Sequence, residues 1–138
     1  VQYMNAGTGI RHSEYNASPS ESLRLLQIWI QPNVQDAEPT YQQIQLNPKD
    51  RPNQWHLIAG DASAPMSIRQ NAEVKTAVIE KDQHLEITAR KKVNYVHVIS
   101  GEVMIADHLV KAGDALVFDE TATITALQDS QMIWFDLP

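Results

Sequence analysis

The sequence has no cysteine, which excludes disulfide frameworks, zinc–thiolate sites, iron–sulfur clusters and cysteine nucleophiles. Basic residues are scarce: 11 Lys and Arg stand against 17 Asp and Glu, a formal net charge of −6. Because nucleic-acid affinity comes largely from Lys and Arg that neutralise phosphates, we expect no direct nucleic-acid partner. No apolar run approaches the ~18 residues of a membrane span, so we expect no membrane partner and a cytoplasmic location, or a nuclear one in a eukaryote.

The residues that are present suit a folded domain, with 43% hydrophobic and 20% charged side chains among 138 residues. In the second half of the chain apolar and polar residues alternate with a period of two, which is typical of β-strands. The expected strands are Ile68–Ile79, Leu85–Ala89, Val93–Ser100, Val103–Ile105, Ala115–Phe118, Thr121–Leu127 and Met132–Leu137. Helical periodicity is absent, although a short helical turn fits between Asn47 and Asn53. The pattern predicts an all-β sandwich or barrel.

A polar, proline-containing stretch at residues 32–40 separates two apolar parts of the chain. We place a boundary there, with residues 1–31 before it, residues 32–40 as a linker and residues 41–138 after it. Leu23–Ile30 is an expected apolar strand, and the residues before it are too few to enclose it. Because Val1–Met4 also has the pattern of a strand, we expect further chain upstream.

His12 and Glu14 are the candidate functional residues of the first part. Residues two apart in a strand point to the same face, so an imidazole and a carboxylate would meet one interior point there. Gly7 and Gly9 would supply the tight turn before that strand. Such a pair suits Fe, Mn, Ni, Cu or Zn, but an H-x-E spacing is also common as a solvated pair.

The residues from Met4 to Asn16 resemble the signature of the pirin family, and Leu26–Ile30 resembles the strand that the family carries shortly afterwards. The spacing Gly9-x2-His12-x3-Asn16 is also similar to the second half of the general cupin motif. Pirins are bicupins, with two small β-barrels in tandem. The resemblance therefore implies a cupin fold, with the end of the first barrel joined to a nearly whole second barrel.

The resemblance also implies a metal centre in the first barrel, held by three histidines and one glutamate. Its third histidine corresponds to His12 and its carboxylate to Glu14; iron is the leading metal, with Zn, Mn, Ni, Cu and Co as alternatives. The family's other two ligands form an H-x-H motif, which this sequence lacks. Catalytic metal sites usually keep three protein ligands, so we expect this chain to hold no metal by itself.

The second barrel is expected to be metal-free. If Gly101 closes the first cupin motif, Asn94 stands at the position of the motif's glutamate. If Gly113 opens the second cupin motif, Ile124 stands at the position of its histidine, and an isoleucine does not bind a metal. The carboxy-terminal barrel of pirins likewise carries no metal.

By resemblance, the intact parent is a metal-dependent dioxygenase of the quercetin 2,3-dioxygenase type that acts on a flavonol-like aromatic substrate. Glu14 would then be the catalytic residue, as a metal ligand and a general base. One alternative is a metal- or redox-responsive protein-binding module that acts as a co-regulator, and another is a stable fragment without activity. Strand-swapped self-association would bury the apolar side chains of Leu23–Ile30.

The other histidines have simpler explanations. His97 shares a strand face with Tyr95 and Ile99, and we expect a hydrogen-bonded ring in or beside the core. Turn-like sequence lies beside the remaining three, which are expected to face solvent: His56, His84 and His108.

Overall fold

Strands make up almost all of the regular structure in the computed structural model, which describes residues 1–138. The strands are β1 (Gln2–Asn5), β2 (Thr40–Gln43), β3 (His56–Gly60), β4 (Met66–Ser67), β5 (Glu73–Ile79), β6 (His84–Ile87), β7 (Val93–Ser100), β8 (Glu102–Ile105), β9 (His108–Lys111), β10 (Ala115–Phe118), β11 (Ala122–Ala126) and β12 (Ser130–Leu137). One turn of 3-10 helix, η1, spans Pro48–Asp50, where a short helical turn was expected. The structure contains no helix with the length and apolar character needed to cross a membrane.

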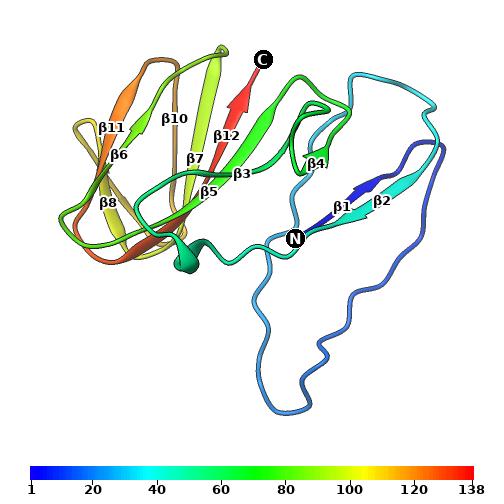
Figure 1. The fold of residues 1–138 in the computed structure, drawn as a ribbon, viewed down its shortest axis with the longest axis horizontal. Coiled ribbons are helices and arrows are strands. Elements are labelled where there is room, and N and C mark those ends of the chain that lie inside the picture. Colours follow the sequence, from blue (N-terminus) through cyan, green and yellow to red (C-terminus); the bar gives the residue numbers. More distant parts are fainter.

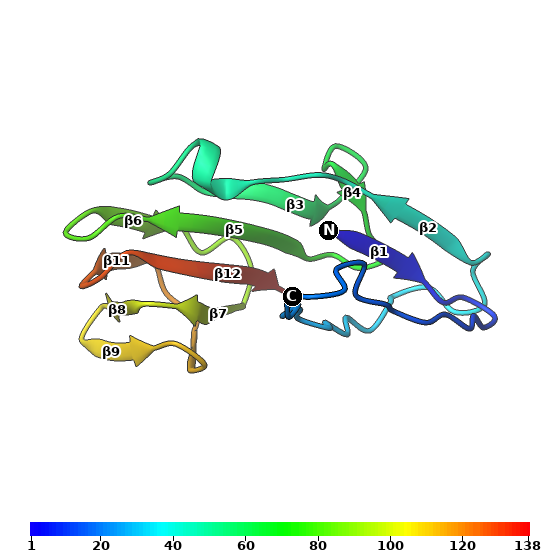
Figure 2. The same ribbon diagram turned by 90° about the horizontal axis from the view of Figure 1, so that it is seen from below.

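Two larger sheets pack as a sandwich (Figure 1, Figure 2). The six-stranded sheet has the order β10-β7-β12-β5-β3-β4, and the four-stranded sheet has the order β6-β11-β8-β9. All strand pairs are antiparallel except β3 with β4. The expected all-β sandwich is therefore confirmed.

The β1–β2 ribbon lies beside the β4 end of the six-stranded sheet (Figure 1, Figure 2). The side-chain amide of Gln42 in β2 donates a hydrogen bond to the carbonyl of Ser67 in β4, at 2.9 Å, and accepts one from the amide of Ser67 at 3.0 Å. The backbone ladder between β1 and β2 joins the start of the chain to the segment that follows the expected linker. The division into residues 1–31, 32–40 and 41–138 stays a prediction.

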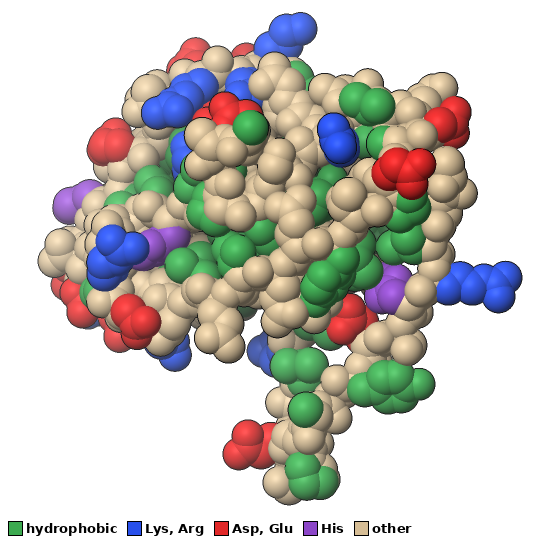
Figure 3. Space-filling view, turned by 45° about the vertical axis from the view of Figure 1, so that its right-hand side comes forward, with side chains coloured by type: hydrophobic (Ala, Val, Ile, Leu, Met, Phe, Trp, Pro, Cys, Tyr) green, Lys and Arg blue, Asp and Glu red, His purple; other side chains and the backbone are tan.

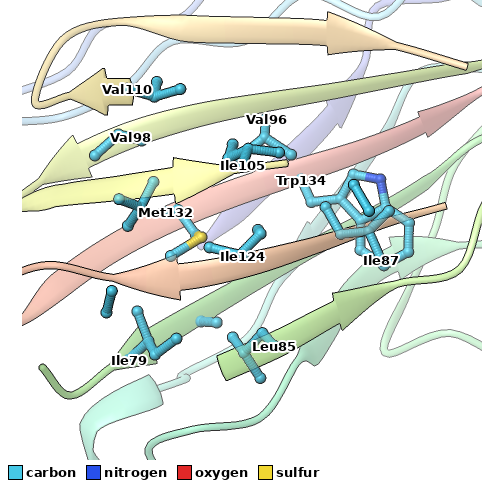
Figure 4. Packing of buried hydrophobic residues seen from close by; sticks show 14 residues of the cluster. Ile79, Leu85, Ile87, Val96, Val98, Ile105, Val110, Ile124, Met132 and Trp134 are labelled. Carbon is cyan, nitrogen blue, oxygen red and sulfur yellow. The ribbon is translucent and has the colours of Figure 1, made fainter. Parts of the chain in front are cut away.

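The main core fills the space between the two larger sheets (Figure 4). Val96 and Val98 of β7 and Met132 of β12 point inward from one sheet, and Ile105 and Ile124 of the other sheet meet them. All five are fully buried. Because burial of one such side chain stabilises a protein by about 1.5–3 kcal/mol, this cluster is the main source of the sandwich's stability.

A second apolar cluster covers the opposite face of the six-stranded sheet. Ile133 and Phe135 alternate with the core residues of β12, and Val74 of β5 and Ile58 of β3 lie beside them. The ring of Tyr95 in β7 meets Phe135 edge-on, with 5.7 Å between the ring centroids. This sheet is therefore apolar on both faces, whereas an antiparallel sheet commonly leaves one face to water.

Several expected elements differ from the structure. β7 and β10 have the expected bounds, but the strand expected at Ile68–Ile79 begins at Glu73, since a turn precedes it. β9 was missed because only Val110 of its four residues is buried, so its pattern is weak; it forms by pairing with β8.

His56 was expected in solvent, but it is buried in β3 with Nε2 2.8 Å from the carbonyl oxygen of Arg51. His84 and His108 are exposed as expected.

We expect Ile124→Ala in β11 to lower the free energy of unfolding by about 2–5 kcal/mol, because it removes a fully buried side chain and leaves a cavity between the sheets. Chemical denaturation monitored by tryptophan fluorescence measures the change. Val117→Ala is the control: Val117 lies in β10 and is 59% exposed, so it should change the stability by about 0.5 kcal/mol or less. Equal effects of the two substitutions would contradict this placement of the core.

Candidate functional site

The candidate ligands His12 and Glu14 follow a tight turn at the end of β1. The amide of Gly9 donates a hydrogen bond to the carbonyl of Ala6, at 2.7 Å, and both Gly7 (φ +48°) and Gly9 (φ +132°) have positive φ angles that favour glycine. A Cβ atom on Gly7 would overlap the carbonyl oxygen of Ala37. The expected glycine turn is therefore confirmed, and it lies against the returning chain.

The two ends of the long loop at residues 6–39 are held together at a neck. β1 and β2 pair there from Gln2 with Gln43 to Asn5 with Thr40. The buried side chain of Asn5 donates a hydrogen bond to the carbonyl of Glu38, at 3.0 Å. The neck fixes where the loop leaves the sheet.

His12 and Glu14 are both exposed, and the segment around them forms no strand. The expectation of a strand here was wrong: a strand needs a hydrogen-bonded neighbour, and no backbone segment pairs with these residues. Asn16 instead stabilises a local turn, in which its Nδ2 donates to the carbonyl of Glu21 at 2.6 Å and its Oδ1 accepts from the amide of Ser18 at 3.1 Å. Because this segment is not a strand, the imidazole of His12 and the carboxylate of Glu14 do not share a strand face.

The structure contains no group of three or more His, Cys, Asp or Glu side chains arranged to hold a metal ion. His12 and Glu14 offer one nitrogen and one oxygen donor, which suits a first-row transition metal. Two exposed donors do not make a closed coordination set, and a catalytic site commonly has three protein ligands. Within this chain the donors do not suffice for the metal centre that the resemblance implies.

The segment Leu23–Ile30 is extended but has no strand partner, so the expectation of a strand was wrong here too. Its side chains are largely exposed, most of all that of Trp29, which is 89% exposed. In the space-filling view, apolar side chains run along the loop that projects from the sandwich (Figure 3). The end of the segment is tied to the sandwich, because Gln70 donates to the carbonyl of Gln31 at 2.8 Å.

A groove of about 560 Å³ lies between this segment and the outer face of β7 and β12. Its walls include Trp29 and Ile30 on one side and Tyr95, His97 and Phe135 on the other. The ring of His97 is half-buried beside the outer apolar cluster, so its expected position in or beside the core is confirmed. The expected hydrogen bond of this ring is absent from the structure.

A partly buried polar cluster, which the sequence analysis missed, lies at one end of the sandwich. Lys75 Nζ is 2.7 Å from Glu73 Oε2 and 4.2 Å from the ring centroid of Trp134, and Arg90 Nη1 is 3.5 Å from Glu73 Oε1. Contact with Lys75 lowers the pKa of Glu73, and the positive charges of Arg90 and Lys91 add to this effect. The sequence does carry a signal for this cluster. Glu73 and Lys75 continue the period-two series of Ala77 and Ile79, which are the core residues of β5, so their side chains are expected on the inner face of the strand.

Two family profiles match separate stretches of the chain. The profile described as "Quercetinase C-terminal cupin domain" matches residues 57–137, and the profile described as "Pirin" matches residues 1–30. The chain is 35% identical to a quercetin 2,3-dioxygenase of Escherichia coli K12 over 141 residues, which cover 99% of the chain and 60% of that protein. It is 32% identical to a pirin-like protein of Caulobacter vibrioides, covering 99% of the chain and 61% of that protein.

Among solved structures, the bacterial pirin YhhW of Escherichia coli in complex with nickel(II) superposes with a TM-score of 0.88 at 32% identity, covering 99% of this chain and 60% of that one. The sandwich is therefore a cupin domain, as expected. The chain belongs to the pirin family. It spans about three fifths of the length of these relatives.

We expect Gly7→Ala to open the neck of the loop, because the new Cβ meets the carbonyl oxygen of Ala37 and the left-handed backbone costs an L-residue about 1–2 kcal/mol. Limited proteolysis within residues 6–39, followed by mass spectrometry, measures this as faster cleavage. Gly9→Ala is the control, since it also has a positive φ but no atom within 4 Å of the new Cβ. If both variants are cleaved at the same rate, the close approach of Gly7 does not hold the neck.

We expect Glu73→Gln to remove part of the pH dependence of stability at acid pH. The lowered pKa means that the folded state binds this proton more weakly than the unfolded state. The stabilisation by Glu73 is therefore present above its ordinary pKa of about 4.3 and is lost as the pH falls through the lower folded value. Denaturation at a series of pH values should give a shallower decline below about pH 4.3 for the variant. An unchanged decline would contradict the assignment.

Proposed function

We propose that the whole protein is a metal-dependent dioxygenase of the quercetin 2,3-dioxygenase type that acts on a flavonol-like aromatic substrate. The observation that carries this proposal is the pair His12 and Glu14, which lies inside the part of the chain that matches the pirin profile. The relative of this type at 35% identity supports it. Because the chain spans about three fifths of that relative, the activity is proposed for the whole protein.

His12 and Glu14 are proposed as two ligands of one metal centre whose other ligands lie outside these 138 residues. The bound metal would supply Lewis-acid and oxygen chemistry. Iron is the leading candidate; the nickel(II) complex of the related bacterial pirin supports nickel as well, and zinc, manganese, copper and cobalt stay open. With two donors the chain is expected to be inactive alone.

Glu14 is proposed as the catalytic residue among those that the chain supplies. Its carboxylate is exposed and free to reach a ligand beside the loop. A carboxylate there would accept the proton of the substrate's hydroxyl group, a role that typically contributes about 10²–10⁴-fold to a rate. His12 would hold and orient the site.

The exposed loop supports a second proposal, that the protein binds another protein chain. Leu23–Ile30 offers an unpaired backbone and apolar side chains beside the groove. Strand-swapped self-association would pair this backbone and bury these apolar side chains. Alternatively, a partner whose binding depends on the metal's oxidation state would make the protein a redox-responsive co-regulator.

We expect the protein extended to the full length of its relatives to hold roughly one metal ion per chain, and the 138-residue chain to hold much less. In the extended protein, His12→Ala should lower the metal content, and Glu14→Ala should lower flavonol-dependent oxygen consumption by about 10²-fold or more. Elemental analysis and an oxygen electrode measure the two effects.

Glu21→Ala is the matched control, because Glu21 is an exposed carboxylate in the same loop whose side chain makes no hydrogen bond. It should leave both values unchanged. Unchanged turnover in Glu14→Ala would contradict the proposed catalytic role. Stoichiometric metal in the short chain, lost in His12→Ala, would instead mean that a second copy or another ligand completes the site.

A further inference from the structure

All hydrogen bonds between residues 1–46 and the rest of the chain end on one short segment, which runs from β4 towards β5. We call residues 1–46 the arm, since they contain the β1–β2 ribbon and the long loop, and residues 66–70 the docking segment. The bonds reach three positions of this segment: Ser67, Arg69 and Gln70. No backbone ladder and no ion pair joins the arm to the sandwich. The docking segment is therefore the polar attachment of the whole arm.

Both strands of the ribbon reach the docking segment, beside β4 (Figure 1). The hydroxyl of Tyr3 in β1 accepts a hydrogen bond from the amide of Arg69, at 3.3 Å. The side-chain amide of Gln42 in β2 forms two bonds with the backbone of Ser67, one as donor and one as acceptor. Because a primary amide carries the same donor and acceptor as a peptide group, Gln42 takes the place that a neighbouring strand would have beside β4.

The long loop reaches the same segment on its way back to β2. The amide of Asn33 donates a hydrogen bond to the carbonyl of Arg69, at 2.7 Å. The side chain of Gln70 donates to the carbonyl of Gln31 at 2.8 Å, and both of these glutamines line the groove. This second bond therefore ties the Leu23–Ile30 wall of the groove to the sandwich.

The docking segment is itself fixed to the sandwich by the alternation of its residues. Met66 and Ile68 are buried in the outer apolar cluster, and the amide of Ile68 donates to the carbonyl of Gly60 at 2.9 Å. Ser67 and Arg69 are exposed. Residues two apart in an extended chain point the same way, so the inward residues anchor the segment while its outward side bonds to the arm.

The attachment of the arm is weak bond by bond, because all five hydrogen bonds lie at exposed positions. A hydrogen bond that competes with water adds little on its own. Four partly buried side chains of the arm also contact the outer cluster: Tyr3, Ile30, Ile44 and Leu46. Apolar contact is not directional, so these side chains hold the arm near the outer face, whereas the hydrogen bonds set where it lies.

The ribbon of the arm has hydrogen bonds of its own. β1 and β2 pair along their whole length, and the amide of Ile44 extends the ladder by donating to the carbonyl of Val1 at 2.9 Å. The ribbon therefore needs no bond to the docking segment in order to stay paired.

We propose that the docking segment is a latch that holds and releases the arm as one unit. Release breaks the five bonds together, leaves the β1–β2 ladder intact and separates Leu23–Ile30 from the outer face, which opens the groove. Because His12 and Glu14 also belong to the arm, the latch sets their position relative to the cupin domain. The proposal does not depend on the proposed dioxygenase activity.

Amide hydrogen exchange of the protein, measured residue by residue by NMR, tests the latch in the variant Gln42→Ala. This substitution removes both bonds to Ser67 but leaves the bond from Asn33 to Arg69 with both of its partners. If the bonds open together, the amide of Asn33 should exchange about tenfold faster, since hydrogen bonds of ordinary net strength are lost from one cooperative unit. The amide of Ile44, which reports on the ladder, should keep its rate.

Gln43→Ala is the matched control. Gln43 is the next residue of β2, and its side chain bonds within the arm, where it accepts from the hydroxyl of Tyr41 at 2.7 Å. The same change of residue type in the same strand therefore removes no bond to the docking segment. It should leave the exchange of Asn33 unchanged.

A reciprocal variant tests the latch from the other side. Gln70→Glu removes the donor to Gln31 but keeps a side-chain oxygen that accepts from the amide of Asn71. It should speed the exchange of the Ser67 amide, although the bond of that amide to Gln42 keeps both partners.

Two results would overturn the proposal. Exchange that rises only at amides that lose their own partner would mean that the bonds open one by one. Exchange that rises equally at Ile44 would mean that the arm unfolds instead of undocking.

Discussion

The central position of β12 in the six-stranded sheet is the constraint on which the rest of the structure depends. Its backbone pairs with β5 on one side and with β7 on the other. Its side chains alternate between the sandwich core, through Met132 and Trp134, and the outer apolar cluster, through Ile133 and Phe135. A shift of register by one residue would exchange the two sets, so both clusters together specify the pairing.

The outer apolar face connects this scaffold to the candidate site. The long loop crosses that face at Leu23–Ile30 and is tied down at its neck and at Gln31, while His12 and Glu14 lie between these two attachments. The scaffold thus determines where the loop begins and ends, but contributes no third donor. This arrangement agrees with a site in which the remaining ligands come from another part of the protein or from a second chain.

The two polar sites of the molecule differ in their physical character. His12 and Glu14 are exposed and lie outside any strand, so no regular element fixes the positions of their side chains. Glu73, Asn94 and Asp136 lie in register on three adjacent strands, and Asn94 and Asp136 are completely buried. In such surroundings an unpaired polar atom is costly.

The sequence by itself determined the all-β class, most of the strands after Glu73 and the glycine turn before His12, because alternation and glycine act over a few neighbouring residues. The resemblance carried by the residues from Met4 to Asn16 led to the cupin fold and the family. Only the tertiary structure decided that Leu23–Ile30 is unpaired, that β9 is a strand and that Glu73, Asn94 and Asp136 share one row. Those facts depend on which strands become neighbours, and local periodicity does not encode the pairing of residues far apart in the chain.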